Sequence, residues 1–377
     1  MKKRKIAVDL TWVRHNKVGG TESCVRNLLD GFTQINTKGM TFVLLLAEDN
    51  AESFSRYRIS GNFELRICDV KSENPKERLL WQNLKMGKML RSLDIGLCLE
   101  PVYGKPFWGT RGIKFITVIH DLQAIHYPQY FSRGRTAWMK ASWKNAVNTS
   151  EMIIAISEYV KQDIREVYGV REDKIQVIYD AVVLDRDNCS ADSGLEKYGV
   201  EKGRYYYTVS SLLPHKNLKT VILALGELKR RKSPAFYPLL VSGVGGKNRD
   251  QLELLIREKG LQGDIIFTPF VEDAERNMLY KNCKVFLFSS IFEGFGMPPI
   301  EAMAMGVPVL TTKCTSLGEV TGELLNYVRK PLDEKEWADR LEKELRLPEE
   351  HHVKQLLGRY ACAAVAKQYI DLLETLE

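Results

Sequence analysis

The stretch 285–310 constrains the fold more than any other part of the chain. It begins with the apolar run VFLF, passes through a loop that contains Gly294 and Gly296, and continues through Pro298 and Pro299 into a short helical pattern. The apolar run GVPVL follows. Prolines are favourable at the start of a helix, where their missing N–H groups would have no helical partner. The pattern predicts a strand, a loop, a helix and a second strand, which is the unit of parallel sheets covered by helices.

The same stretch predicts a ligand site at the carboxyl end of its first strand. A loop followed by a helix start directs backbone N–H groups and the positive end of the helix dipole to that place, and this suits a phosphate. Glu293 in the loop and Glu301 on the helix lie eight residues apart, so both carboxylates can face one ligand. Carboxylates repel phosphate and favour hydroxyl groups, so a nucleotide sugar meets both demands. For the two acids alone, solvated surface glutamates are the simpler interpretation.

Short apolar runs and helical patterns alternate along the rest of the chain. At 377 residues it exceeds what one hydrophobic core usually organises, so we expect two domains, with the polar segment 184–193 between them. Strands are predicted near residues 6–10, 41–47, 63–67, 95–99, 114–119, 153–156, 174–179, 205–209, 237–241, 265–267, 285–288 and 307–310. The main helices are predicted near 23–32, 77–93, 130–143, 218–230, 271–282, 337–345 and 353–376. The sequence therefore predicts an α/β fold with parallel sheets.

Loops between these strands and helices carry further candidate residues. Gly19 and Gly20 follow the first strand, where glycines let a ligand approach the backbone closely. Lys216 precedes a helix, so its ammonium group can pair with phosphate. Gly243 belongs to a glycine loop at 242–247, which by itself is weak evidence. His120 ends an apolar strand, and a histidine in that position more often packs or caps than acts in catalysis.

Together with these loops, the string EGFGMPPIE resembles the E-x7-E signature of retaining glycosyltransferases with the GT-B fold, especially those of family 4, which are mannosyl-, glucosyl- and rhamnosyltransferase-like enzymes. The resemblance implies two Rossmann-like, doubly wound parallel-sheet domains that face a central cleft. Residues 1–184 would form the acceptor-side domain, and residues 185–360 would bind the nucleotide sugar. A final helix at about 361–377 would pack back on the first domain.

The resemblance also assigns roles to single residues. His120 matches the histidine that touches the transferred sugar, Lys216 the lysine that holds the diphosphate, and Glu293 a sugar-binding acid; these three are the predicted catalytic residues. Ser211 stands where many members have arginine, so a protonated His215 is the candidate second cation. The predicted donor-binding residues are Gly19, Gly20, Ser211, His215, Gly243, Phe295, Gly296, Met297 and Glu301.

Charge and composition bear on partners. The first 185 residues hold 28 Lys and Arg against 21 Asp and Glu, so this half carries the whole net charge of +7. Such a surface suits an anionic membrane or a lipid diphosphate, although a solvated basic face without a partner fits equally well. The segment 130–143 mixes cations with Trp138 and Trp143, which suits a membrane interface, unless both tryptophans face the core. No nucleic-acid motif is present, and a nucleic-acid partner is not expected.

The seven cysteines are scattered without a C-x-x-C pair, which fits reduced thiols in a cytoplasmic protein and argues against disulfides and zinc. We expect no metal and no cofactor, because Lys216, a helix start and glycine loops can supply positive potential to a leaving diphosphate. No apolar run approaches the ~20 residues that span a bilayer.

The expected function is retaining transfer of a hexose-type sugar from a nucleoside diphosphate to a saccharide or lipid-linked acceptor. The expected setting is polysaccharide synthesis at the inner face of the cytoplasmic membrane. A non-catalytic nucleotide-sugar-binding protein of the same fold is the alternative.

Overall fold

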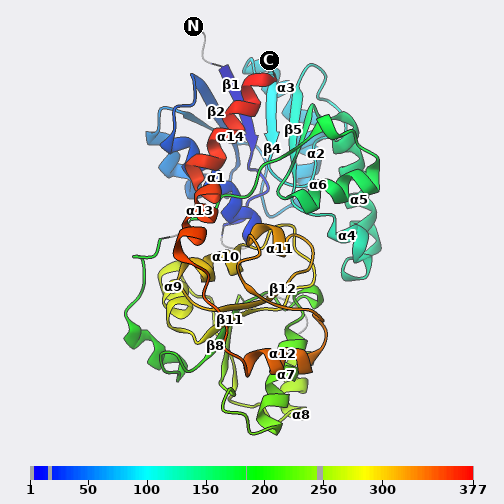
Figure 1. Ribbon diagram of the computed structural model, residues 1–377. Helices are drawn as coiled ribbons and strands as arrows, with labels where there is room; N and C mark the ends of the chain where they lie inside the picture. The colour runs from blue at the N-terminus through cyan, green and yellow to red at the C-terminus, as the bar shows by residue number, and fades with distance from the viewer. Residues whose placement is uncertain (1–3, 16–18, 184, 244–248, 377) are drawn as a thin grey trace. The chain divides into compact units, whose positions relative to one another are not determined.

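The computed structural model describes residues 4–15, 19–183, 185–243 and 249–376, which form two compact units (Figure 1). Unit 1 comprises residues 1–183 and 359–377, and unit 2 comprises residues 184–358. The chain therefore enters unit 2 once and leaves it once. The boundaries expected from the sequence, after residues 184 and 360, lie within two residues of these positions.

Unit 1 is built on a parallel sheet with the strand order β3-β2-β1-β4-β5-β6-β7. The strands are β1 (Arg4–Asp9), β2 (Met40–Ala47), β3 (Phe63–Cys68), β4 (Leu97–Glu100), β5 (Lys114–Ile119), β6 (Met152–Ala155) and β7 (Ile175–Val177). Every residue of β2, with the sequence MTFVLLLA, is buried. Such continuous apolar runs are typical of parallel strands that are covered on both faces.

The helices of unit 1 surround this sheet. They are α1 (Gly20–Gln34), α2 (Pro75–Trp81), α3 (Gly87–Ser92), α4 (Gln123–His126), α5 (Arg133–Thr149), α6 (Glu158–Tyr168) and α14 (Cys362–Thr375). The C-terminal α14 lies beside α1, as Figure 1 shows. A Cβ atom at Gly31 of α1 would stand 2.2 Å from the carbonyl oxygen of Cys362, so the two helices approach this closely only because residue 31 is glycine.

Unit 2 repeats the design with the strand order β10-β9-β8-β11-β12-β13. The strands are β8 (Tyr206–Val209), β9 (Leu239–Ser242), β10 (Ile265–Phe267), β11 (Val285–Phe288), β12 (Val309–Thr312) and β13 (Asn326–Val328). All of their pairings are parallel. The prediction of a parallel α/β fold is thus confirmed, although β13 was not foreseen.

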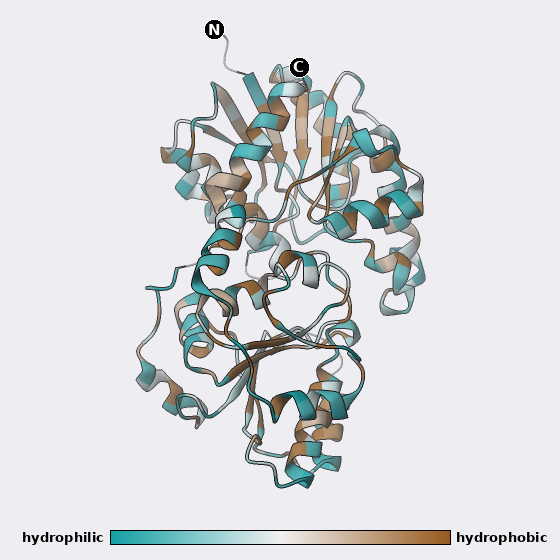
Figure 2. Ribbon diagram, in the orientation of Figure 1, coloured by the Kyte–Doolittle hydropathy of each residue, from teal (hydrophilic) through white to brown (hydrophobic). Residues whose placement is uncertain are grey.

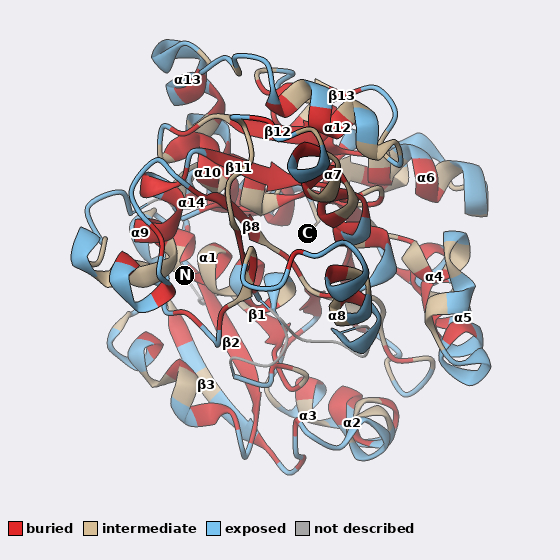
Figure 3. Cartoon of the chain, turned by 90° about the horizontal axis from the view of Figure 1, so that it is seen from below, coloured by how far each residue is buried: buried red, intermediate tan, exposed pale blue. Residues whose placement is uncertain are grey.

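The helices of unit 2 are α7 (Leu218–Arg230), α8 (Arg249–Glu258), α9 (Asp273–Asn282), α10 (Met297–Ala304), α11 (Leu317–Val320) and α12 (Glu334–Leu341), followed by α13 (Glu350–Tyr360), which crosses the unit boundary. Sequence analysis missed α8. Trp337 of α12 is completely buried in the core that α7 shares with β8 and β9. Apolar residues concentrate on the strands and on the inner faces of the helices (Figure 2), and the central strands are buried (Figure 3).

The helical segment predicted at 77–93 is confirmed over residues 75–92, but it is not α-helical throughout, because a π-helical turn, Gln82–Met86, lies between α2 and α3. The interruption has identifiable partners: Gln82 Nε2 donates to Asp9 Oδ2 at 2.6 Å, and Asn83 Oδ1 accepts from the Phe107 N–H at 2.8 Å. Wide turns of this kind re-aim side chains within a helix. Contacts with distant parts of the chain thus determine this break, and the local periodicity does not show it.

The helix predicted at 353–376 is also divided, because Ala361, with ψ 137°, separates α13 from α14.

On α5 the two tryptophans have different environments. Trp143 is fully buried, whereas Trp138 is 42% exposed and lies one helical turn from the exposed Arg135. Within the described residues, no helix is both long and apolar enough to cross a bilayer.

Candidate active site

Both sheets reverse their strand order at one position, between β1 and β4 in unit 1 and between β8 and β11 in unit 2. Ligands of open α/β sheets bind at such switch points, outside the carboxyl ends of the strands. The loops after β8 and β11 carry Lys216 and Glu293, so these two predicted residues lie at the switch point of unit 2. The structure therefore brings the β8–α7 loop and the β11–α10 loop together.

The β8–α7 loop is fixed directly on the loop that follows β11. The Ile291 N–H donates to the His215 carbonyl at 2.8 Å, and Ser289 Oγ donates to the Lys216 carbonyl at 2.7 Å. The turn Pro214–Lys216 ends at Asn217, which has a left-handed φ of 54° and caps the start of α7. Asparagine is one of the few side chains that adopt this conformation readily. The backbone of Lys216 is thus held by the loop after β11 and by its own turn.

Lys216 and Glu293 form an ion pair with 2.6 Å between Nζ and Oε1. Their side chains are only 21% and 13% exposed, so solvent screens the pair less than it screens a surface pair. The predicted phosphate-binding cation and the predicted sugar-binding acid therefore contact each other directly.

A second segment, after β12, holds the backbone of Glu293. The Glu293 N–H donates to Thr315 Oγ1 at 2.9 Å, and the same hydroxyl donates to the Glu293 carbonyl at 2.9 Å. Ser316 Oγ lies 3.0 Å from both the Glu293 and the Phe295 carbonyl oxygens. Sequence analysis missed Thr315 and Ser316. The one available signal was their place after the carboxyl end of a parallel strand.

The start of α10 differs from the sequence-based expectation in one respect. Gly296 caps the helix with φ +100°, and a Cβ atom there would stand 2.5 Å from Leu317 Cδ2, so the position requires glycine. Pro298 and Pro299 follow Met297 and have no N–H groups, so the early helix offers fewer amide donors than an ordinary helix start. The donors near this end therefore come from Gly296, Met297 and residues next to them.

Glu301 has its own supporting contacts. Its Oε2 accepts a hydrogen bond from the Tyr280 hydroxyl at 2.9 Å and lies 3.9 Å from Arg276 Nε. Burial pulls the pKa of Arg276 down, but Glu301 and other acidic neighbours more than offset this effect, and the net pKa lies above its ordinary value. Arg276 therefore remains charged and neutralises Glu301.

The prediction that protonated His215 supplies the second cation is wrong. His215 is buried, and this burial lowers its pKa to about 4, with a further contribution from the positive charge of Lys216 and an opposing one from Glu293. The imidazole is therefore neutral at pH 7. Positive charge on this loop comes from Lys216 alone.

The other predicted residues of unit 2 occupy adjacent loops. The Ser211 carbonyl accepts a hydrogen bond from Ser210 Oγ at 2.8 Å, and Gly243, with φ +84°, lies against the backbone of Ser210. The rest of the glycine loop predicted at 242–247 lies outside the described residues from 244 onward. Phe295 is buried and Met297 is partly exposed.

In unit 1, Gly19 and Gly20 stand at the start of α1 as expected. Gly19 has φ 76° and ψ −142°, a conformation that favours glycine, and Gly20 is the first helical residue. The first turn also contains Glu22, which is buried and pairs with Arg26 at 2.9 Å. The glycine loop therefore leads into a helix start whose own carboxylate is neutralised.

His120 follows β5 as predicted, but its side chain is buried within unit 1. Its Nε2 lies 2.8 Å from the Pro101 carbonyl, and its Nδ1 faces Asp180 at 3.8 Å. The predicted contact between His120 and a sugar stays a prediction.

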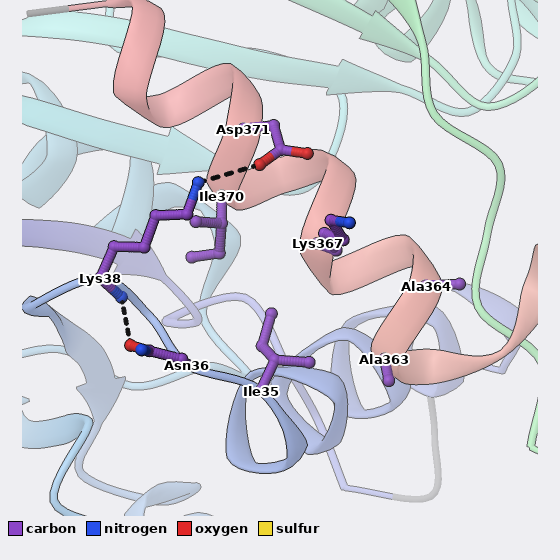
Figure 4. A pocket seen from close by; sticks show the side chains of 8 residues that line it. All are labelled: Ile35, Asn36, Lys38, Ala363, Ala364, Lys367, Ile370 and Asp371. Carbon is purple, nitrogen blue, oxygen red and sulfur yellow. Dashed lines mark hydrogen bonds and ion pairs between the residues drawn. The ribbon is translucent and has the colours of Figure 1, made fainter.

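Two other hollows lie in the described surface. One, of about 400 Å³, lies between the segment after α1 and α14 (Figure 4) and includes Lys38, which pairs with Asp371. Because Lys38 directly precedes β2, this hollow is at the amino edge of the sheet, opposite the switch point. The other, of about 340 Å³, lies between the β8–α7 loop and α8 and is lined mainly by leucines.

Comparison with known proteins agrees with this architecture. Residues 18–186 match the family model "Glycosyltransferase Family 4", and residues 195–355 match "Glycosyl transferases group 1". O-antigen chain mannosyltransferase B of Escherichia coli is 28% identical over 213 residues, which cover 56% of this chain and 56% of that protein. O-antigen chain mannosyltransferase RfbU of Salmonella typhimurium is 29% identical over 231 residues, 61% of each chain. The alignments thus span less than two thirds of these relatives.

Solved structures show the same fold over nearly the whole chain. Sucrose-phosphate synthase of Thermosynechococcus elongatus has a TM-score of 0.76 at 16% identity, with 99% of each chain covered. HepE of Anabaena, solved with UDP and glucose, has a TM-score of 0.66 at 19% identity, again with 99% of each chain covered. The two parallel-sheet units and these neighbours define the GT-B fold, and the two family models identify the class as glycosyltransferases. Within that class the chain belongs to glycosyltransferase family 4.

Proposed function

We propose that the protein is a retaining hexosyltransferase that moves a sugar from a nucleoside diphosphate donor to a saccharide or lipid-linked acceptor during cell-surface polysaccharide synthesis. The names of the two O-antigen relatives favour mannose as the transferred sugar. The observation that supports this most directly is the Lys216–Glu293 pair at the switch point of unit 2. It places a fixed cation and a fixed carboxylate where a diphosphate and a sugar would each find a partner.

In the proposed reaction the bond between the anomeric carbon and the diphosphate oxygen breaks, and the electron pair goes to the diphosphate. Lys216 stabilises that developing charge, which is the main electrostatic demand of the step. The acceptor oxygen forms its bond to the same face of the anomeric carbon, and its proton passes to the leaving phosphate oxygen. Glu293 binds sugar hydroxyls, and Glu301 binds the ribose hydroxyls. No metal is needed in this scheme.

A covalent role for Glu293 is the alternative within the same enzyme class. The clamp formed by Thr315 and Ser316 holds the Glu293 backbone, which suits either a hydroxyl acceptor or a nucleophile. A slow fluorinated donor followed by mass spectrometry of the intact protein separates the two. Front-face transfer leaves the mass unchanged, whereas a nucleophile adds one glycosyl group that is lost in Glu293→Gln.

The proposal is tested with donor binding and turnover. A melting screen against GDP-mannose, UDP-hexoses, UDP-N-acetylhexosamines and dTDP-rhamnose should show one donor that stabilises by about 2.7 kcal/mol at 100 times its dissociation constant. With that donor, Lys216→Ala should lower turnover by about 100-fold or more. Lys219→Ala, which removes an exposed lysine three residues away, should retain normal turnover. Equal turnover in both variants would exclude Lys216 from the mechanism.

A non-catalytic nucleotide-sugar-binding protein remains the second candidate, because the same pair could hold a donor without transferring it. The two differ in donor hydrolysis, since transferases usually release free sugar slowly when acceptor is absent. Stabilisation by a donor without release of either product would favour the binding protein.

We further propose peripheral contact between an anionic membrane and the outer face of α5. Trp138 is 42% exposed there with the exposed Arg135 one turn away, and Arg133, Lys140 and Lys144 are exposed elsewhere on the same helix. An aromatic side chain among cations suits the headgroup region of a bilayer. Trp138→Ala should weaken co-sedimentation with phosphatidylglycerol vesicles, whereas Ile59→Ala, at a 93% exposed apolar position of the same unit, should not. Equal binding of both variants would place any membrane contact elsewhere.

A further inference from the structure

Three side chains that commonly bind metal ions meet inside unit 1. They are Cys24 on α1, His120 after β5 and Asp180 after β7. The thiol sulfur, a ring nitrogen and a carboxylate oxygen all lie within 4.8 Å of one another. All three residues line a small cavity of about 20 Å³. The cluster therefore combines three different ligand types around one space.

The hydrogen bond of His120 fixes which ring nitrogen faces that space. The Pro101 carbonyl can only accept, so Nε2, at 2.8 Å from it, carries the hydrogen. In the neutral ring Nδ1 is then a lone-pair donor to whatever it faces, and it faces Asp180 Oδ2 at 3.8 Å. Metal-binding histidines characteristically donate their other N–H to a carbonyl or carboxylate in this way.

Asp180 accepts a hydrogen bond from the Cys24 thiol within this cluster. Its carboxylate and the lone pair of Nδ1 are both acceptors, so they favour a positive group between them.

We propose that Cys24, His120 and Asp180 bind a divalent cation of the zinc class. Tetrahedral zinc with ligand distances near 2 Å separates nitrogen and oxygen ligands by roughly 3.3 Å, so the observed 3.8 Å needs to contract by about half an ångström. The cavity of about 20 Å³ that these residues line has room for a single particle of the size of one ion or one water. The ion ties α1 to the ends of β5 and β7.

The spacing of the cysteines along the chain does not indicate this site, because no C-x-x-C pair is part of it. The three ligands here lie far apart along the chain and come from three elements. The ion supplies no chemistry to the proposed transfer, but it occupies Nδ1 of His120, because Nε2 is already bonded to the Pro101 carbonyl. A bound ion would therefore exclude the predicted contact between His120 and the transferred sugar, and that consequence alone rests on the proposed function.

A second group of possible ligands has to be removed before testing. Glu349, His351 and His352 are exposed and also lie close enough together to share an ion. The experiment therefore uses full-length protein in which His351 and His352 are replaced by alanine. Cobalt(II) is the probe, because a cobalt–thiolate bond gives an intense charge-transfer absorption, and zinc is the competitor.

One equivalent of cobalt should produce the thiolate band, and zinc should abolish it. Cys24→Ser should remove the band, and Asp180→Asn should weaken cobalt affinity by 10–100-fold. Cys314→Ser, at a partly buried thiol in unit 2, is the matched control and should keep the band. The melting temperature should rise with zinc in the parent protein and in Cys314→Ser, but not in Cys24→Ser.

Two results would overturn the proposal. One is the absence of a thiolate band in the parent protein. The other is a band that survives Cys24→Ser. If Cys24→Ser fails to fold, Asp180→Asn and the zinc-dependent melting of the parent still decide the question, because neither depends on the thiol variant.

Discussion

His215 and Lys216 are adjacent in one turn, yet only the lysine is charged at neutral pH. The difference arises from burial, since His215 is 5% exposed and loses its proton readily, whereas Lys216 reaches the Glu293 carboxylate. A neutral histidine offers hydrogen bonds but no charge. In the proposed function, Lys216 therefore has to supply the positive charge for the diphosphate without help from His215.

This difference predicts a pH dependence of stability. The pKa of His215 is about 4 in the folded protein and about 6.5 in an unfolded chain, so between these values only the unfolded state binds the proton. As the pH is lowered from about 6.5 to about 4, the free energy of unfolding should fall, and His215 should account for about 3 kcal/mol of that decrease. Urea unfolding at several pH values should show that His215→Gln removes this component. His351→Gln, at an exposed histidine, should keep it.

Glu100, at the end of β4, gives the opposite pH dependence. Burial and the neighbouring Asp9 raise the pKa of Glu100 well above its usual value. Between its unfolded pKa of about 4.3 and that raised value, only the folded state keeps the proton, so stability declines as the pH rises. Glu100→Gln should flatten this decline in urea unfolding. Asp9→Asn should destabilise instead, because Asp9 accepts bonds from Thr11 and Gln82. A destabilised Glu100→Gln at pH 8 would contradict this account.

At the scale of elements, the start of α10 depends on the space around Gly296. Gly296→Ala adds a Cβ atom 2.5 Å from Leu317 Cδ2 to a left-handed backbone. Gly306→Ala, at φ +76° with nothing within 4 Å, has the left-handed strain without the clash. Each strained alanine should cost about 1–3 kcal/mol, and Gly296→Ala should cost more and also weaken donor binding. Equal losses in thermal stability would show that the loop accommodates the added methyl group.

In the segment after β12, substitutions of Thr315 should affect donor binding to different degrees. Thr315 has φ 53°, an uncommon conformation for a β-branched residue, and its hydroxyl makes both hydrogen bonds to the Glu293 backbone. Thr315→Ser keeps the hydroxyl and should retain donor affinity. Thr315→Ala leaves the Glu293 backbone without these partners and should weaken donor binding by about 1–3 kcal/mol, measured by calorimetry. Equal donor affinity in the two variants would show that the hydrogen bonds between Thr315 and the Glu293 backbone do not contribute to donor binding.

At the scale of the whole molecule, unit 1 is completed only when the chain returns to it. Val365, Tyr369, Ile370 and Leu373 of α14 are buried, and each contributes about 1.5–3 kcal/mol. Their sum is comparable with the total stability of a domain, about 5–15 kcal/mol. Deleting residues 361–377 should therefore unfold unit 1. Residues 184–358 expressed alone should still give a cooperative melting transition. A truncated protein with two intact transitions would refute this view.

The sequence predicted every strand except β13, the parallel sheets and the positions of the site loops, because short apolar runs and glycine or proline loops are local signals. It did not predict which side chains meet. Thr315 and Ser316 reach Glu293 from another strand, Gln82 and Asn83 interrupt a helix for distant partners, and His215 loses its charge because the fold buries it. All of these depend on contacts between separate elements, which no local pattern records.

Because the chain crosses between the two units only twice, unit 2 is a continuous insertion between the two segments of unit 1. Two junctions, near residues 184 and 358, would suffice to transplant it from a homologue. If unit 2 alone selects the donor, such a chimera would inherit a new sugar while keeping the old acceptor.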